Sequence, residues 1–195
     1  MQRCGSGGMA WRVAVAALGA LLVAGCSSKQ DLGIIPDTPG LVARLRSPSS
    51  AATGTVRVVD YRDGVTLQLV ISNMIPGQYR VALHETGNCS SSNLFSAGPP
   101  WAPPGQSPDD LLPGFLANND GNQNGYVAFI KGVHTEGPGS LRGRSVVVHW
   151  GSRVGEAFPG QPNNRIACGV LACGSSGELL HANGAARVEL RSGEL

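Results

Sequence analysis

The sequence predicts an all-β domain, built as a sandwich or a barrel. After residue 40, short runs rich in Val, Leu and Ile recur between clusters of Gly, Pro and Asn, which is the pattern of strands separated by turns. The 195 residues include 28 Gly and 13 Pro, which favours turns over long helices. No window of about a dozen residues after the N-terminal segment repeats with the 3.6-residue period of a helix. No repeat of about 20–50 residues is present, which excludes a solenoid.

The strands follow one another along the chain as β-branched or alternating runs. Asp63-Gly64 lies between two of them and predicts a hairpin turn. Residues 95–124 are too long for a plain connection, and a loop of this length is usually functional or disordered. The expected strands are Leu41–Leu45, Thr55–Tyr61, Val65–Ile71, Tyr79–His84, Tyr126–Ile130, Ser145–His149 and Ala186–Leu190.

The N-terminus is typical of a secretory leader. Arg3 and Arg12 precede an apolar run, Val13 to Ala24, that is shorter than the roughly 20 residues of a membrane span, which disfavours an uncleaved anchor helix. The run ends in Val-Ala-Gly-Cys, which resembles the lipobox of bacterial lipoproteins, where the cysteine receives a lipid and becomes residue one. The sequence therefore predicts a signal peptide at 1–25, a lipidated Cys26 with a flexible tether over 26–40, and a domain at 41–195.

This processing predicts a location and excludes one class of partner. The lipid on Cys26 would hold the domain at a membrane of the cell envelope, and Ser27 favours the periplasmic face of the outer membrane in a bacterium that has one. Removal of residues 1–25 leaves 13 basic and 13 acidic residues. A neutral domain has no electrostatic footprint for nucleic acid.

The cysteines indicate one disulfide. With Cys4 removed and Cys26 lipidated, three cysteines remain in a compartment that permits disulfides. A bond between Cys89 and Cys168 would close a loop of about eighty residues and stabilise the fold by roughly 4 kcal/mol. Cys173 is then either a buried free thiol or a competing partner.

Three segments together resemble the Cu,Zn superoxide dismutase family. They are Gly77–Glu85, followed by Cys89 and Ser-Ala-Gly-Pro at 96–99; Leu141–His149; and Asn164–Val170. They occur in the family's order and the resemblance covers residues 41–175. It implies an eight-stranded Greek-key sandwich or flattened barrel and a Cys89–Cys168 disulfide.

The same resemblance implies that the metal sites are degenerate. His84 and His149 match two copper ligands, but Ala82 and Pro100 stand where the family has the other two histidines, one of which bridges to zinc. Copper that changes oxidation state needs three or four imidazoles in fixed geometry.

The zinc site has lost more of its ligands. Residues 99–125 contain no histidine, so Asp110 is the one plausible zinc ligand left, and zinc binding is not expected. Arg153 falls near the family's outer aspartate that links the two metals.

Other residues receive ordinary roles. Arg165 matches the arginine that guides superoxide to copper, and without a metal it would hydrogen-bond to loop backbone. We expect His134 and His181 to lie at the surface, and Trp101 and Trp150 to fill the core. A hydrolase is disfavoured because no Gly-x-Ser-x-Gly elbow is present.

The sequence therefore favours an envelope lipoprotein with the dismutase fold that acts as a non-catalytic binding or structural domain. The alternative is a divergent copper-dependent dismutase or a copper-binding protein that uses His84 and His149, with Glu85 or a methionine as a further donor. Copper binding would be weak in the first case. The protein partner is not identified by the sequence, and homodimerisation is a third option.

Overall fold

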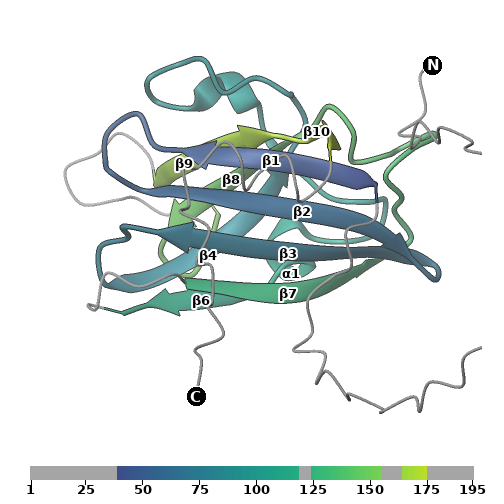
Figure 1. Ribbon diagram of the computed structural model, residues 1–195, viewed down its shortest axis with the longest axis horizontal. Helices are drawn as coiled ribbons and strands as arrows, with labels where there is room; N and C mark the ends of the chain where they lie inside the picture. The colour runs from purple at the N-terminus through teal and green to yellow at the C-terminus, as the bar shows by residue number, and fades with distance from the viewer. Residues whose placement is uncertain (1–38, 119–123, 155–163, 175–195) are drawn as a thin grey trace, which may run out of the picture.

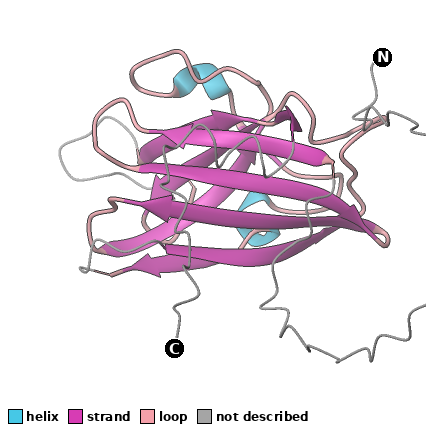
Figure 2. Ribbon diagram, viewed as in Figure 1, coloured by secondary structure: helices cyan, strands magenta, loops and turns pink. Residues whose placement is uncertain are grey.

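The computed structural model describes residues 39–118, 124–154 and 164–174, which form a curled antiparallel sheet structure with two short helices (Figures 1 and 2). The elements are β1 (Gly40–Arg46), β2 (Thr53–Tyr61), β3 (Gly64–Ser72), β4 (Gly77–His84), η1 (Phe95–Ala97), β5 (Pro100–Trp101), α1 (Pro108–Leu111), β6 (Gly114–Ala117), β7 (Asn124–Lys131), β8 (Ser145–Trp150), β9 (Arg165–Val170) and β10 (Ala172–Gly174).

The strands form two layers joined at one edge. Strands β1, β2, β3 and β7 are neighbours in the layer that faces the viewer in Figure 1, and β6, β4, β8 and β9 form the other. Strand β9 joins the layers through its pairing with β1. Leaving aside the two- and three-residue strands β5 and β10, the described residues form eight strands, so the predicted eight-stranded Greek-key sandwich or flattened barrel is confirmed.

The core lies between the layers because the strands alternate apolar and polar residues. In β3, Leu67, Leu69 and Ile71 are buried while Thr66 and Gln68 are partly exposed. Strand β8 differs, because Ser145 to His149 are all buried. Loop segments and side chains therefore cover the outer side of β8, and His149 lies beneath them.

Six of the expected strands are confirmed, corresponding to β1–β4, β7 and β8. The expected strand Ala186–Leu190 lies outside the described residues. The interval 95–124 was expected to be one long loop, and this is wrong in part, because it contains β6, which pairs with the start of β4. Strand β6 has only four residues, with Phe115 and Leu116 between a Pro-Gly pair and Ala117, so its pattern is too short to detect.

The hairpin between β2 and β3 turns one residue earlier than predicted. Tyr61 pairs with Gly64, so the turn residues are Arg62 and Asp63, and Arg62 has a positive φ of 52°. Gly64 is required for a different reason. A Cβ atom at this position would lie 2.2 Å from the carbonyl oxygen of Ile130 on β7.

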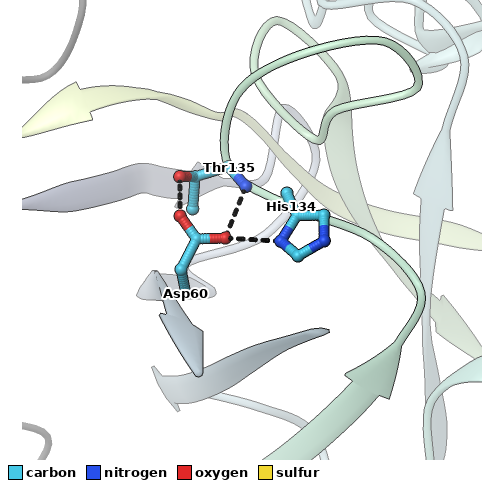
Figure 3. Close-up of polar contacts among 3 residues, drawn as sticks. All are labelled: Asp60, His134 and Thr135. Carbon is cyan, nitrogen blue, oxygen red and sulfur yellow. Dashed lines mark hydrogen bonds and ion pairs between the residues drawn. The ribbon is translucent and has the colours of Figure 1, made fainter. Parts of the chain in front are cut away.

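His134 lies at the surface, as predicted, and anchors a loop (Figure 3). Its Nδ1 donates to Oδ1 of Asp60, 3.2 Å away at the end of β2. The same carboxylate accepts hydrogen bonds from the backbone N–H of Thr135, at 3.1 Å, and from the Thr135 hydroxyl. These bonds hold the segment after β7 against the β2–β3 hairpin.

The predicted leader, Cys26 and most of the tether lie outside the described residues, as does His181. Among the residues that the structure does describe, no helix is long and apolar enough to cross a membrane.

Candidate metal centre

The two histidines that the sequence assigned to copper lie on one face of neighbouring strands. His84 ends β4 and His149 lies near the end of β8, and the two strands are antiparallel. In this register Ala82 is opposite Val147, between the two histidines, because alternate residues share a face. Both imidazoles are buried, with exposed fractions of 0% for His84 and 1% for His149.

The two rings meet end to end. Their Nε2 atoms are 3.0 Å apart. The ring centroids are 5.2 Å apart and the planes differ by 13°. The ring centroids are farther apart than the two Nε2 atoms by about the width of one ring, so each Nε2 lies on the line between the ring centres. The rings are therefore collinear and roughly coplanar, and they are not stacked face to face.

The outer nitrogens are held by two acceptors. Nδ1 of His84 donates to the carbonyl oxygen of Gly98 at 2.9 Å. Nδ1 of His149 donates to Oδ1 of Asn164 at 2.9 Å. The orientation of this amide is fixed, because its Nδ2 donates to the carbonyl oxygens of Trp150, at 3.0 Å, and Arg153, at 2.9 Å.

Burial keeps both histidines neutral. Desolvation lowers the pKa of His84 to about 4, against an opposing effect of the Gly98 carbonyl, and the Arg165 guanidinium lowers it further. Burial likewise lowers the pKa of His149 to about 4, although the Asn164 amide acts in the opposite direction. At neutral pH each ring therefore carries one proton.

Arg165 donates to the same loop that holds His84. Its guanidinium donates to the carbonyl oxygens of Leu94, at 2.7 Å, and Gly98, at 2.9 Å, and lies 5.1 Å from the ring centroid of Phe95. The carbonyl of Gly98 thus accepts from both Arg165 and His84. Both hydrogen bonds of Arg165 go to loop backbone.

A disulfide fixes the base of this loop. Cys89 and Cys168 are bonded, with their Cα atoms 5.7 Å apart, so the predicted pairing is confirmed. Cys173 is exposed on β10, so the alternative of a buried thiol is wrong. The loop that carries Leu94 and Gly98 is therefore tied covalently to β9, the strand that carries Arg165.

The comparison with known proteins gives the family. A family profile of copper/zinc superoxide dismutase (SODC) matches residues 52–171, more than half of the chain. The chain belongs to the copper/zinc superoxide dismutase family. It is similar to the extracellular superoxide dismutase [Cu-Zn] of Brugia pahangi, at 28% identity over 157 residues, covering 71% of this chain and 78% of the relative. It is also similar to superoxide dismutase [Cu-Zn] of Onchocerca volvulus, at 26% identity over 144 residues, covering 64% of this chain and 90% of the relative.

The residues present do not fit the copper and zinc set of the superoxide dismutase family. Ala82 is buried beside the histidine pair, and Pro100 on β5 pairs with His84, and neither side chain has a donor atom. Within 39–118, 124–154 and 164–174, no three His, Cys, Asp or Glu side chains are grouped to hold a metal ion. Glu85, considered as a further donor, is exposed and belongs to no such group.

The two aspartates of α1 differ in burial and contacts. Asp110 is exposed, whereas Asp109 is partly buried and its Oδ1 accepts from the backbone N–H of Val154 at 2.8 Å. The backbone carbonyl of Asp109 accepts from Arg80, whose Nε also donates to the carbonyl of Ser152 at 2.7 Å. Arg80 and Asp109 therefore join α1 to the segment that follows β8.

Sequence reasoning missed the residues that position the site. Asn164 directly precedes Arg165 in a recognised motif, yet no role was assigned to it from the sequence. The structure shows that Asn164 is buried, and a buried asparagine side chain needs hydrogen-bond partners. Arg80 could have been noticed, because alternation places it on the face of Ala82 and His84. Trp101 and Trp150 pack against the core, as expected.

Proposed function

We propose that this chain is a superoxide dismutase-family domain that does not dismute superoxide and that serves as a binding or structural domain of the cell envelope. One observation carries the proposal. Of the four positions where the family has copper histidines, only His84 and His149 keep imidazoles. These two rings are buried, and their Nε2 atoms contact each other at 3.0 Å. Dismutation needs copper that changes oxidation state in a fixed set of ligands, and two donors do not supply that set.

The location is part of the same proposal. The lipobox-like sequence before Cys26 supports a signal peptide over 1–25, a lipid on Cys26, and attachment to a membrane of the envelope. Metabolic labelling with a fatty acid tests it. Label should enter the wild-type chain and not the Cys26→Ser variant, and equal labelling of both would contradict the anchor.

The decisive experiment for the activity is reconstitution. The purified chain, with its Cys89–Cys168 bond intact, is incubated with Cu(II) and Zn(II), and superoxide consumption is measured by pulse radiolysis. We expect a rate no higher than that of buffer containing the same residual copper. A copper-dependent rate near the diffusion-controlled limit of about 10⁹ M⁻¹s⁻¹ would contradict the proposal.

Copper binding without dismutation is the second candidate function. The observation in its favour is the end-to-end pair, in which Nε2 of His84 and Nε2 of His149 face each other at 3.0 Å with both outer nitrogens already engaged. Equilibrium dialysis with copper tests it in the wild type and in His149→Gln. The exposed histidine variant His134→Gln is the matched control, and equal copper uptake by all three would rule out this site.

A further inference from the structure

Three large apolar side chains gather at one corner of the surface, and we call them the β7 patch. They are Tyr61 at the end of β2 and Val127 and Phe129 on β7, with exposed fractions of 50%, 54% and 46%. Val127 and Phe129 share a face, because alternate residues of a strand point the same way. The rings of Tyr61 and Phe129 meet edge to face, with their centroids 6.4 Å apart. Exposed apolar surface that is contiguous marks a contact site more often than scattered residues do.

The β7 patch lies at the end of the sheet where the chain enters the domain. Strand β1 begins at Gly40, at the same end of the front layer as the β2–β3 hairpin (Figure 1). Gly40 lies beside Val59, Val59 pairs with Thr66, and Thr66 pairs with Phe129. Neighbouring strands are about 4.8 Å apart, so Gly40 and Phe129 are separated by roughly 15 Å. Along this row Gly40 and Val59 are buried, Thr66 is partly exposed and Phe129 is exposed, so the accessible surface lies toward β7.

The lipid proposed for Cys26 is within reach of this corner. About 14 residues separate Cys26 from Gly40, so even the fully extended chain keeps Gly40 within about 50 Å of the lipid. Such a tether holds the domain near the bilayer at a high effective concentration, and a weak contact is then enough to hold one face against it. Because the tether joins the domain at Gly40, surfaces close to Gly40 reach the bilayer most readily.

We propose that the β7 patch docks on the phospholipid bilayer in which the lipid of Cys26 is inserted. The inference rests on the proposed lipid anchor and adds an orientation to it. Tyrosine and phenylalanine rings suit the boundary between headgroups and acyl chains, where the ring is apolar and the tyrosine hydroxyl reaches water. Two long cationic side chains border the patch: the Arg62 guanidinium lies 5.0 Å from the ring centroid of Tyr61, and the Lys131 side chain is 77% exposed. Both are long enough to reach lipid phosphates while the rings insert.

The charges at this corner are balanced, so apolar contact supplies most of the proposed docking. Asp63 lies 3.5 Å from Lys131, and the Asp60 carboxylate accepts from His134 and Thr135. These acids offset the attraction of Arg62 and Lys131 to anionic lipid. Docking should therefore persist at high salt, which screens exposed charges but not apolar contact.

A second copy of this chain is the other occupant that an apolar patch could accept. A stable protein interface buries about 800 Å² on each partner. Three side chains that are about half exposed supply on the order of 300 Å². This area is too small for a stable dimer, but a contact that only has to orient a tethered domain needs no more. The area therefore favours the bilayer.

Docking by the β7 patch would turn the other layer away from the bilayer. That layer contains β4 and β8, which carry His84 and His149, and β9, which carries Arg165. A soluble partner would therefore meet the β4–β8 layer and the loop held by Arg165. The proposed orientation thus leaves this layer available for the binding role of the domain.

The test is hydroxyl-radical footprinting of the chain purified from membranes and reconstituted into vesicles of phosphatidylethanolamine and phosphatidylglycerol. Phe95 is the internal control, because it is 51% exposed and lies beside Arg165 of the other layer. We expect Tyr61 and Phe129 to be oxidised at least roughly threefold more slowly than Phe95, at low and at high salt.

A charge within the patch should release it from the bilayer. In Val127→Asp the contact between Tyr61 and Phe129 is untouched, yet both rings should be oxidised about as fast as Phe95, because a carboxylate opposes insertion. Ile75→Asp is the matched control, since Ile75 is 58% exposed and lies beyond the far end of β3. It should leave the protection of Tyr61 and Phe129 unchanged, and equal protection in both variants would overturn the patch.

Flotation of the vesicles separates the possible failures, and it needs only the wild type. A chain that does not float with the vesicles overturns the anchor and the docking together. A chain that floats while Tyr61 and Phe129 are oxidised as fast as Phe95 overturns the docking and leaves the anchor intact. Protection that disappears when the chain is diluted with excess lipid identifies a second copy as the occupant and overturns the bilayer.

Discussion

At the residue scale, the burial of His84 and His149 makes stability depend on pH. The pKa of each ring is lowered to about 4 by burial, whereas an unfolded histidine keeps a value near 6.5. Between these values the unfolded chain binds more protons than the folded chain. The stabilising contribution is therefore complete above pH 6.5 and is lost as the pH falls toward 4.

We expect the free energy of unfolding to fall between pH 7 and pH 4.5, by on the order of 3 kcal/mol for a ring that titrates alone. Urea unfolding at a series of pH values measures this. His149→Gln removes one of the two titrating rings, so its stability should depend less on pH, while His134→Gln should follow the wild type. Identical pH profiles for all three proteins would show that the buried rings do not set the dependence.

At the scale of elements, Arg80 joins segments that are far apart in the sequence. From β4 it donates to the carbonyls of Asp109 and Ser152, and also to that of Leu112 at 3.4 Å, while Asp109 accepts from Val154. The Arg80 guanidinium and the Asp109 carboxylate thus connect helix α1 to the segment after β8. The same segment contains the Arg153 carbonyl that orients Asn164.

We expect Arg80→Met to lower the free energy of unfolding by about 1–3 kcal/mol, because charged hydrogen bonds are lost and their acceptor carbonyls are left without this donor. Hydrogen exchange should accelerate at residues 107–112 and 150–154. Arg46→Met, on the exposed side of β1, removes the same charge and should change stability by less than about 0.5 kcal/mol. Unchanged exchange in both segments would show that Arg80 does not fasten them.

The disulfide acts on the loop between β4 and η1. It closes a separation of 79 residues and fixes the segment whose Leu94 and Gly98 carbonyls receive Arg165. We expect replacement of both cysteines by serine to cost roughly 4 kcal/mol, measured by urea unfolding. Reduction of the wild type should give a similar loss, and a loss below about 1 kcal/mol would mean that Arg165 and η1 hold the loop without the bond.

Strands with a long alternating pattern of apolar and polar residues could be predicted from the sequence, whereas strands that form only by pairing with a distant segment could not. The runs that became β1, β2 and β3 are long enough for period-two patterning to reveal them. Strand β6 has four residues and exists because it pairs with Gly77 to Arg80, which no local pattern encodes. In the site, the type and position of His84 and His149 were readable from motifs, but their collinear contact depends on Gly98 and Asn164, which only the folded chain brings together.

At the scale of the whole molecule, the fold is kept while the ligand set is reduced. The strands, the disulfide and the loop contacts of Arg165 form a framework that does not depend on the missing imidazoles. Ala82 lies between the two histidines on the same face, and Pro100 is the register partner of His84. Both missing ligand positions therefore border the existing pair, so adding back their side chains tests whether ligand loss alone would account for the proposed lack of dismutation.

We expect Ala82→His to create a third nitrogen ligand and to convert the site to one that binds Cu(II), seen by electron paramagnetic resonance. The double variant Ala82→His with Pro100→His should gain copper-dependent dismutation of at least about 10²-fold over the parent, because the second imidazole also supplies a proton donor near the metal. Ala82→Asn with Pro100→Asn is the control for side-chain volume and should gain neither property. If the double variant binds Cu(II) stoichiometrically and still does not dismute superoxide, then the site has lost more than its ligands, and the surroundings of Arg165 become the place to look.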